Sequence, residues 1–137
     1  MGDSADPLVI VDAANVVGSV PDGWWKDRVG ATTRLRDRIA GLAGDGVPDS
    51  SVPEWAAQGP VEVVLVVEGK ARHVEGTETV SVVSAKGSGD DAIVDLVAGA
   101  APRRTLVVTA DRALRDRVTA LGAVITGPRS INRIGNN

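Results

Sequence analysis

The sequence predicts an α/β protein with three layers, in which helices cover both faces of a mainly parallel sheet of four to five strands. Two observations support this fold class. Short, nearly continuous runs of branched aliphatic residues, such as residues 8–12 and 61–67, are typical of strands that are buried on both faces. These runs alternate with helical segments, which calls for parallel strands joined by right-handed crossovers. With 137 residues, the chain is expected to form a single domain, residues 1–137, with its own core.

The strands are predicted from their composition and from the turn residues that bound them. The third is more alternating than the others and is expected near an edge of the sheet. The link between the second and third strands need not contain a full helix. The five predicted strands are residues 8–12, 61–67, 79–84, 105–108 and 123–125.

A first long helix is predicted over residues 24–43, with Asp22 as a candidate for its start. Its apolar or semi-apolar positions recur at intervals of three or four, which gives one buried stripe. The stripe consists of Trp25, Val29, Thr32, Leu35, Ile39 and Leu42.

Two further helices are predicted in the second half of the chain. One begins at Ser88 or Asp90 and reaches about Gly99, and the other covers residues 111–121, with Leu114, Val118 and Leu121 inward. Three segments lack a periodic pattern and are expected to be irregular: a disordered lead over residues 1–7, a long loop over 44–60 that Trp55 attaches to the body, and a tail over 127–137.

Composition excludes several classes of protein. There is no cysteine and only one histidine, so disulfides, thiolate zinc sites and sites with two imidazoles are excluded. The absence of Phe and Tyr argues against RNA modules that stack bases on a ladder of these aromatics. No apolar run approaches the length of a membrane helix and the first residues do not resemble a signal peptide, so a cytoplasmic location without membrane contact is expected.

The net charge of −3 hides an uneven distribution. Residues 1–100 carry 16 acidic and 8 basic residues, whereas residues 101–137 carry 2 acidic residues and 7 arginines. An acidic body could hold metal ions while the arginines attract a phosphate backbone. A solvated helix face and tail would explain the same charges.

Acidic and polar residues follow most of the predicted strands. Because ligands of parallel sheets bind beyond the carboxyl ends of the strands, these side chains are candidates for one site. Carboxylates suit Mg²⁺ or Mn²⁺, which support phosphodiester cleavage without Cys or His. The candidates are Asp12 and Asn15 after the first strand, Glu68 after the second, Asp90, Asp91 and Asp95 in the helix after the third, and Asp111 after the fourth.

Each of these residues also has a structural explanation. Asp111 and Asp90 could cap helices, and Asp12 with Asn15 could form a local turn. Glu68 could be an exposed turn residue, and Asp95 an ordinary exposed acid of a helix. If each residue only capped a helix or formed a turn, however, there would be no reason for all of them to lie at one edge of the sheet.

Four stretches of the sequence resemble the PIN-like nuclease superfamily, in particular its NYN domain branch and the YacP-like ribonucleases. They occur in the family's order and span most of residues 8–125. The stretches are Val9-Ile10-Val11-Asp12-Ala13-Ala14-Asn15-Val16, Val66-Val67-Glu68-Gly69, Gly89-Asp90-Asp91-Ala92-Ile93-Val94-Asp95 and Val107-Val108-Thr109-Ala110-Asp111-Arg112. The sequence departs from the family at Glu68, where Asp is common, and in the 44–60 loop, which has no counterpart.

This resemblance implies a PIN-like fold, a Mg²⁺ or Mn²⁺ cofactor and RNA as substrate, which describes a metal-dependent endoribonuclease. By their positions in the motifs, Asp12, Asp91 and Asp111 match the metal-binding acids and Asp95 the acid one turn further on. Asn15 matches the polar residue after the first strand. Thr109 would orient Asp111 or a bound water. Since Asp90 and Asp91 are adjacent, either could be the ligand.

Two alternatives remain open at this point: a non-catalytic module that binds RNA or protein, and a phosphohydrolase acting on small nucleotides. A ribosome or an antitoxin-like protein is a possible partner, and the oligomeric state is open. The residues expected to contact RNA phosphates are Arg112, Arg115, Arg129, Arg133 and Lys86, with Lys70 and Arg72 as alternatives.

Overall fold

A computed structural model describes residues 6–21 and 23–134 of the chain. Its centre is one sheet of five parallel strands in the order β3-β2-β1-β4-β5. The predicted fold class is therefore confirmed, and the strands differ from the predicted ranges by two residues or fewer at each end. The strands are β1 (Leu8–Asp12), β2 (Glu62–Val67), β3 (Ser81–Ser84), β4 (Thr105–Val108) and β5 (Val124–Thr126).

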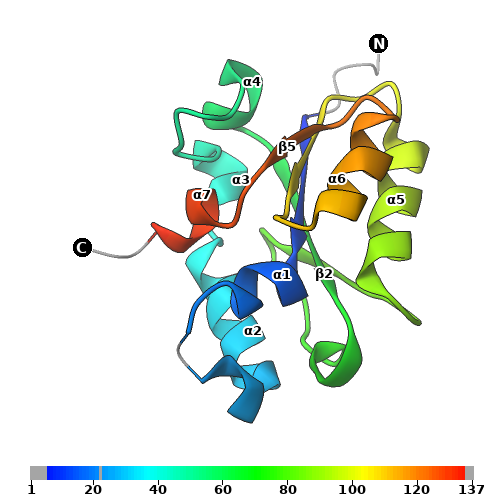
Figure 1. The fold of residues 1–137 in the computed structure, drawn as a ribbon. Coiled ribbons are helices and arrows are strands. Elements are labelled where there is room, and N and C mark those ends of the chain that lie inside the picture. The colour runs from blue at the N-terminus through cyan, green and yellow to red at the C-terminus, as the bar shows by residue number, and fades with distance from the viewer. Residues whose placement is uncertain (1–5, 22, 135–137) are drawn as a thin grey trace.

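Helices cover both faces of this sheet (Figure 1). One face carries α1 (Ala13–Gly18), α2 (Arg28–Arg38), α3 (Leu42–Asp45), α4 (Glu54–Ala57) and α7 (Arg129–Asn132), and the other carries α5 (Gly89–Ala100) and α6 (Arg112–Thr119). Two 3₁₀ helices, η1 (Trp24–Lys26) and η2 (Gly69–Ala71), lie in the connections. Among the described residues, no helix combines the length and apolar character needed to cross a membrane.

Alternating residues of the strands supply two separate cores. Val9, Val11 and Leu65 face the layer of α1 to α4 and α7, whereas Ile10 and Val64 face α5 and α6. Aliphatic side chains pack both layers, so β1 is buried along its whole length. This burial explains the continuous apolar runs in the sequence.

The order of the strands determines where a ligand can bind. The chain moves outward in one direction from β1 through β2 to β3, and then returns to the other side of β1 with β4 and β5. In such sheets the crevice lies beyond the carboxyl ends of the strands where the direction reverses. The reversal here lies between β1 and β4, whose carboxyl ends lead into Asp12 and Thr109.

The single helix predicted over residues 24–43 is wrong. Asp27 caps α2, since its carboxylate accepts a hydrogen bond of 2.9 Å from the amide of Gly30, so the helix starts at Arg28. The predicted burial of Trp25 and Val29 is also wrong, because 56% and 45% of their surfaces are exposed. A turn at residues 39–41 separates α2 from α3. Asp22 lies outside the described residues.

Segments predicted to be irregular contribute to the core. Residues 44–60 contain α4 and bury Val47, Val52 and Ala56, and the partly buried Trp55 packs against the same cluster. The predicted tail contains α7 with a fully buried Ile131. These apolar residues are too widely spaced along the chain to give a periodic signal. The predicted inward position of Leu121 is also wrong, because α6 ends at Thr119 and 43% of Leu121 is exposed.

Candidate active site

The candidate site lies at the carboxyl edge of the sheet, where β1, β2 and β4 end and α5 begins. Asp12 is the last residue of β1, and only 6% of its surface is exposed. Its Oδ2 accepts a hydrogen bond of 2.9 Å from the hydroxyl of Thr109, and its Oδ1 accepts one of 3.4 Å from the amide of Asn15 at the start of α1. Asp12 is thus both a helix cap and a buried carboxylate.

The surroundings of Asp12 disfavour its charged form. The pKa of Asp12 is raised to about 6, mainly by burial and to a smaller extent by the nearby negative charges of Asp90 and Glu68, while the hydrogen bonds from Thr109 and Asn15 act in the opposite direction. Three carboxylates from β1, the end of β2 and α5 therefore act on one another electrostatically. A bound cation would relieve this repulsion.

Thr109 connects Asp12 to Asp111. Its hydroxyl donates to Asp12 and accepts a hydrogen bond of 3.1 Å from the amide of Asp111. Asp111 caps α6, because its Oδ1 accepts a bond of 3.0 Å from the amide of Leu114. Asn15 ties α1 to the same loop, since its Oδ1 accepts a bond of 2.7 Å from the amide of Ala110.

Glu68 holds the start of α5 against the end of β2. Its Oε2 accepts a hydrogen bond of 2.5 Å from the amide of Gly89. A side chain at Gly89 would collide with the same carboxylate oxygen. Glu68 is half-buried and not a simple exposed turn residue, and its longer side chain gives it the reach to this amide. Sequence reasoning missed the role of Gly89, which has no side chain to mark it.

Of the two adjacent acids at the start of α5, Asp90 is the one close to the other carboxylates. Burial raises the pKa of Asp90, and so do the charges of Asp111 and Glu68. Asp91 is exposed and pairs with Arg117 of α6, at 3.1 Å between its Oδ1 and a guanidinium nitrogen. Asp95, one turn further along α5, is also exposed. Ser88 caps this helix, which confirms one of the two predicted possibilities.

The basic residues differ in their exposure and in their contacts. Arg115 is half-buried, and its Nε donates a hydrogen bond of 2.9 Å to the carbonyl of Thr109, so it supports the loop that carries the site. The remaining candidates for phosphate contacts are exposed at the surface: Arg112, Arg129, Arg133, Lys86, Lys70 and Arg72.

The oxygen-only donor set suits a hard divalent cation. Within residues 6–21 and 23–134, no three Asp, Glu or His side chains are arranged closely enough to enclose a metal ion. Mg²⁺ does not need such a cage, because it commonly keeps several waters and takes one or two carboxylates. The buried carboxylate of Asp12, with Asp90 and Glu68 nearby, has the oxygen chemistry that such a site of one or two carboxylates requires.

Comparison with solved structures finds this fold in Rae1 (YacP) from Bacillus subtilis. One structure matches with a TM-score of 0.68 and 18% sequence identity over 92% of this chain and 71% of that chain. A second structure, of a variant with one tryptophan replaced, matches with a TM-score of 0.65 and 17% identity over 92% and 72%. No family model and no curated protein sequence matches the chain. The fold is therefore PIN-like, and the resemblance to the YacP group is confirmed at the level of the fold.

Proposed function

We propose that this protein is an endoribonuclease that uses Mg²⁺ or Mn²⁺ to hydrolyse phosphodiester bonds in RNA. The observation that carries the proposal is the carboxylate of Asp12 at the reversal point of the sheet, whose charged form is destabilised mainly by burial and also by the charges of Asp90 and Glu68. A buried charge without a cationic neighbour is costly, so a site of this kind favours a cation. The fold shared with Rae1 (YacP) supports the same function.

In this proposal Asp12 and Asp90 are the main metal ligands, with Asp111 and Glu68 beside them. When bound, the metal would polarise the phosphodiester and lower the pKa of a water molecule for attack on phosphorus. Thr109 holds Asp12 in one orientation and fixes the start of α6 through the amide of Asp111. Asn15 fixes the loop between β4 and α6 against α1. Asp91 and Asp95 would act as outer acids at the rim of the site.

RNA is the proposed substrate and binding partner, and exposed arginines and lysines would contact its phosphates. The cytoplasm, where messenger and ribosomal RNA are abundant, is the proposed location. A ribosome or an antitoxin-like protein as a further partner, and the number of subunits, stay predictions from the sequence.

Cleavage of a labelled single-stranded RNA tests the proposal directly. Wild-type protein is incubated with the RNA and Mn²⁺ or Mg²⁺, and in parallel with excess EDTA. Cleavage should require the metal and should fall by about 100-fold or more in Asp12→Asn, the scale of a lost charge-stabilising group in an active site. Asp45→Asn removes the same charge from an exposed position on α3 and should leave cleavage unchanged. Equal cleavage by wild type and Asp12→Asn would exclude the proposed site and point to a contaminating nuclease.

A non-catalytic RNA-binding module is the second candidate. It is favoured by the hydrogen bonds through which Asp12 and Asp111 cap helices, because capping alone could account for these residues. This candidate predicts RNA binding without metal-dependent cleavage, so the experiment above separates the two functions.

A further inference from the structure

Next to the acidic site lies a pocket of about 230 Å³ that the proposed chemistry does not use. It is formed where α1, η1, the start of α2 and η2 meet, and its walls include Ala13, Trp24, Arg28, Glu68 and Gly69. Ala13 directly follows Asp12, and Glu68 belongs to both the pocket and the acidic cluster. The pocket therefore adjoins the site and shares Glu68 with it.

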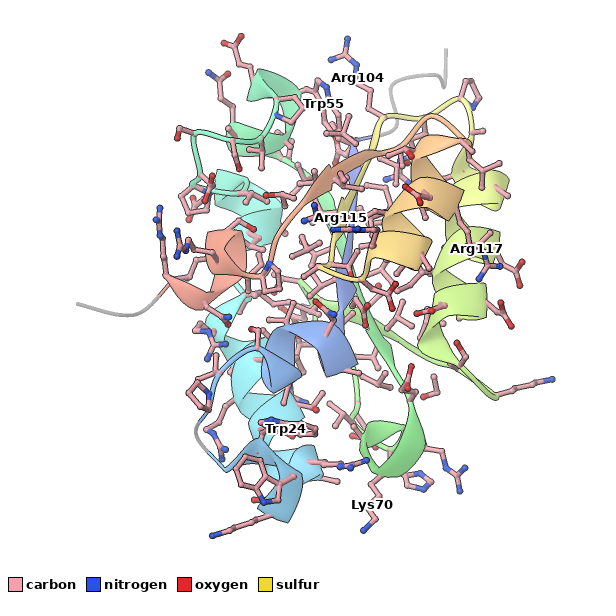
Figure 2. All side chains as sticks on the ribbon, in the orientation of Figure 1. Trp24, Trp55, Lys70, Arg104, Arg115 and Arg117 are labelled. Atoms are coloured by element: carbon pink, nitrogen blue, oxygen red, sulfur yellow. The ribbon has the colours of Figure 1, made fainter. Side chains whose placement is uncertain are left out.

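One wall of this pocket is an aromatic ring covered by a cation. The guanidinium carbon of Arg28 lies 5.3 Å from the centroid of the Trp24 ring. Trp25 meets the same ring edge to face, with centroids 6.0 Å apart and planes at 88°. The ring also lies close to α1, since a Cβ on Gly18 would be 3.6 Å from Cζ2 of Trp24. Figure 2 shows Trp24 beside the end of α1, on the side of α2.

The use of tryptophan in this chain supports a role at the surface. The sequence contains three Trp and no Phe or Tyr, and the buried core consists of aliphatic residues. Trp24 and Trp55 are half-buried, and 56% of Trp25 is exposed. Large aromatic rings kept at the surface beside a pocket are typical of recognition sites.

We propose that this pocket binds a single nucleobase of the RNA strand, which stacks on the Trp24–Arg28 wall while its phosphate lies toward Asp12. This inference rests on the proposed function, because it names the part of the substrate next to the cleaved bond. Drug-sized ligands occupy pockets of about 300–1,000 Å³, so a pocket of 230 Å³ suits a single ring system. Bases in single-stranded RNA stack on aromatic side chains and on arginine planes, as this wall would allow.

Glu68 adds chemical selectivity to the pocket. One of its carboxylate oxygens accepts a hydrogen bond from Gly89, and a carboxylate has further acceptor capacity. A carboxylate can accept from the exocyclic amino group of cytosine, adenine or guanine, whereas uracil has no amino group and offers only the N–H of its ring imide. Uracil is therefore expected to bind most weakly.

Tryptophan fluorescence tests occupancy of the pocket without any cleavage. Trp25→Phe with Trp55→Phe leaves Trp24 as the only tryptophan, and Trp24→Phe with Trp55→Phe leaves Trp25. In EDTA, AMP, GMP, CMP and UMP are titrated into each protein, and so is a short single-stranded RNA. The Trp24-only protein should be quenched by the nucleotides, least by UMP, and more tightly by the RNA, while the Trp25-only protein should respond more weakly. Absence of quenching in the Trp24-only protein would overturn the inference, and equal quenching by all four nucleotides would overturn the selectivity of Glu68.

A binding series with matched variants gives a second, independent measurement. The affinity of a fluorescein-labelled single-stranded RNA is measured by anisotropy in EDTA, with circular dichroism to verify that each variant is folded. Trp24→Leu should weaken binding about tenfold, whereas Trp24→Phe, which keeps an aromatic face, should bind like wild type. Trp25→Leu changes a neighbouring ring that does not line the pocket and should bind within about twofold of wild type. Unchanged binding by folded Trp24→Leu would also overturn the inference.

These outcomes are distinguishable from failure of the proposed function. If wild-type protein cleaves RNA with Mn²⁺ but folded Trp24→Leu binds normally, the pocket inference alone is wrong. If no RNA is cleaved and the Trp24-only protein is still quenched, the nuclease proposal is wrong and the pocket is a base-binding site of a non-catalytic module. Quenching by mononucleotides with no tighter binding of RNA would assign the pocket to small nucleotides, against the inference.

Discussion

Asp12 ends β1 as a buried carboxylate whose two oxygens each receive a hydrogen bond from a neutral donor, the Thr109 hydroxyl and the Asn15 amide. From the sequence, a turn residue and a metal ligand are alternatives at this position. The structure shows a cap whose charge remains poorly compensated, so one residue can have both roles. The two roles make opposite predictions for stability.

Replacing Asp12 by Asn is expected to stabilise the metal-free protein at neutral pH. The pKa of Asp12 is raised to about 6 in the folded protein from its ordinary value of 3.8, so the folded protein holds this proton more tightly than the unfolded chain. Its contribution to stability is present below pH 3.8 and is lost as pH rises through about 6. A shift of this size corresponds to at most about 3 kcal/mol, and the loss of one acceptor reduces the net gain to about 1–2 kcal/mol.

Denaturant unfolding of wild type and Asp12→Asn in EDTA, from pH 4 to pH 7, measures this effect. Wild type should lose stability over this window more steeply than the variant. Thermal melts should also show stabilisation of wild type by Mn²⁺, which Asp12→Asn should lose. A variant that is less stable by about 1 kcal/mol and keeps the full Mn²⁺ effect would make Asp12 a structural residue only.

The hydroxyl of Thr109 is expected to be essential to the arrangement of the acids. Thr109→Val keeps the shape of the side chain but removes the donor to Asp12 and the acceptor for the amide of Asp111. We expect a loss of about 1–3 kcal/mol in unfolding free energy and slower RNA cleavage, because buried polar groups lose their partners. Thr109→Ser keeps the hydroxyl and should retain most of the stability and most of the RNA cleavage of wild type. If Thr109→Val cleaves RNA like wild type, the hydroxyl does not position the site.

At the scale of secondary-structure elements, the first turn of α5 is fixed to β2 by the hydrogen bond between Gly89 and Glu68. Gly89→Ala places a methyl group against the carboxylate and should displace Glu68 from the amide. Since Asp90 is the next residue, we expect RNA cleavage and Mn²⁺ stabilisation to decrease together. Gly99→Ala, near the other end of the same helix and in open space, is the matched control and should leave both unchanged. A fully active Gly89→Ala protein would show that the position of Glu68 is unimportant.

The segment of residues 44–60 should behave as part of the core and not as a dispensable loop. Val47 is fully buried, and its amide donates a hydrogen bond of 2.8 Å to the carbonyl of Ala56. Val47→Ala is expected to lower the free energy of unfolding by about 1–3 kcal/mol, because it removes buried methyl groups and leaves a cavity. Ser50→Ala in the same segment is exposed and should change stability by less than about 0.5 kcal/mol. If denaturant unfolding gave the same free energy of unfolding for wild type and Val47→Ala, the result would support the interpretation of this segment as a loop.

Strands are more predictable than helices in this chain for a physical reason. A strand buried on both faces, such as β1, is marked by every one of its residues, whereas α3, α4 and α7 are single turns whose packing is decided by distant residues. The prediction of one helix over 24–43 fails because Asp27 can be either a helical residue or a cap, and only its contact with Gly30 decides between them.

At the scale of the whole molecule, folding brings separate basic segments together. Asn132 of α7 accepts a hydrogen bond of 3.3 Å from Arg38 of α2 and donates one of 2.8 Å to Ser19 at the end of α1. Arg129 begins α7 and Arg133 follows its last residue, so both arginines belong to a segment that lies beside the basic α2. The charge asymmetry of the sequence indicates a phosphate-binding end, but it cannot show that residues from the first half of the chain join it.

The candidate site, like the fold, could be predicted from the sequence only in part. The acids after β1 and β4 follow from strand ends and can be named from the sequence. The choice of Asp90 over Asp91 depends on the rotation of α5, which Glu68 and Arg117 help to set from other elements. The pocket of Trp24 and Arg28 is assembled from four segments, so no local pattern could reveal it.

Arg133 should contribute to RNA binding through charge alone. It is exposed, and each phosphate contact on single-stranded RNA contributes about 0.7 to the slope of log affinity against log salt concentration. Arg133→Gln should therefore weaken RNA binding at low salt, lower the magnitude of the slope by up to about 0.7, and affect different RNA sequences equally. Arg104→Gln is the matched control, because Arg104 is exposed just before β4, at the amino edge of the sheet (Figure 2). Anisotropy titrations at several salt concentrations measure both slopes. Equal slopes for the two variants would mean that RNA does not run along α7, and the arginines of α6 would then be the next to test.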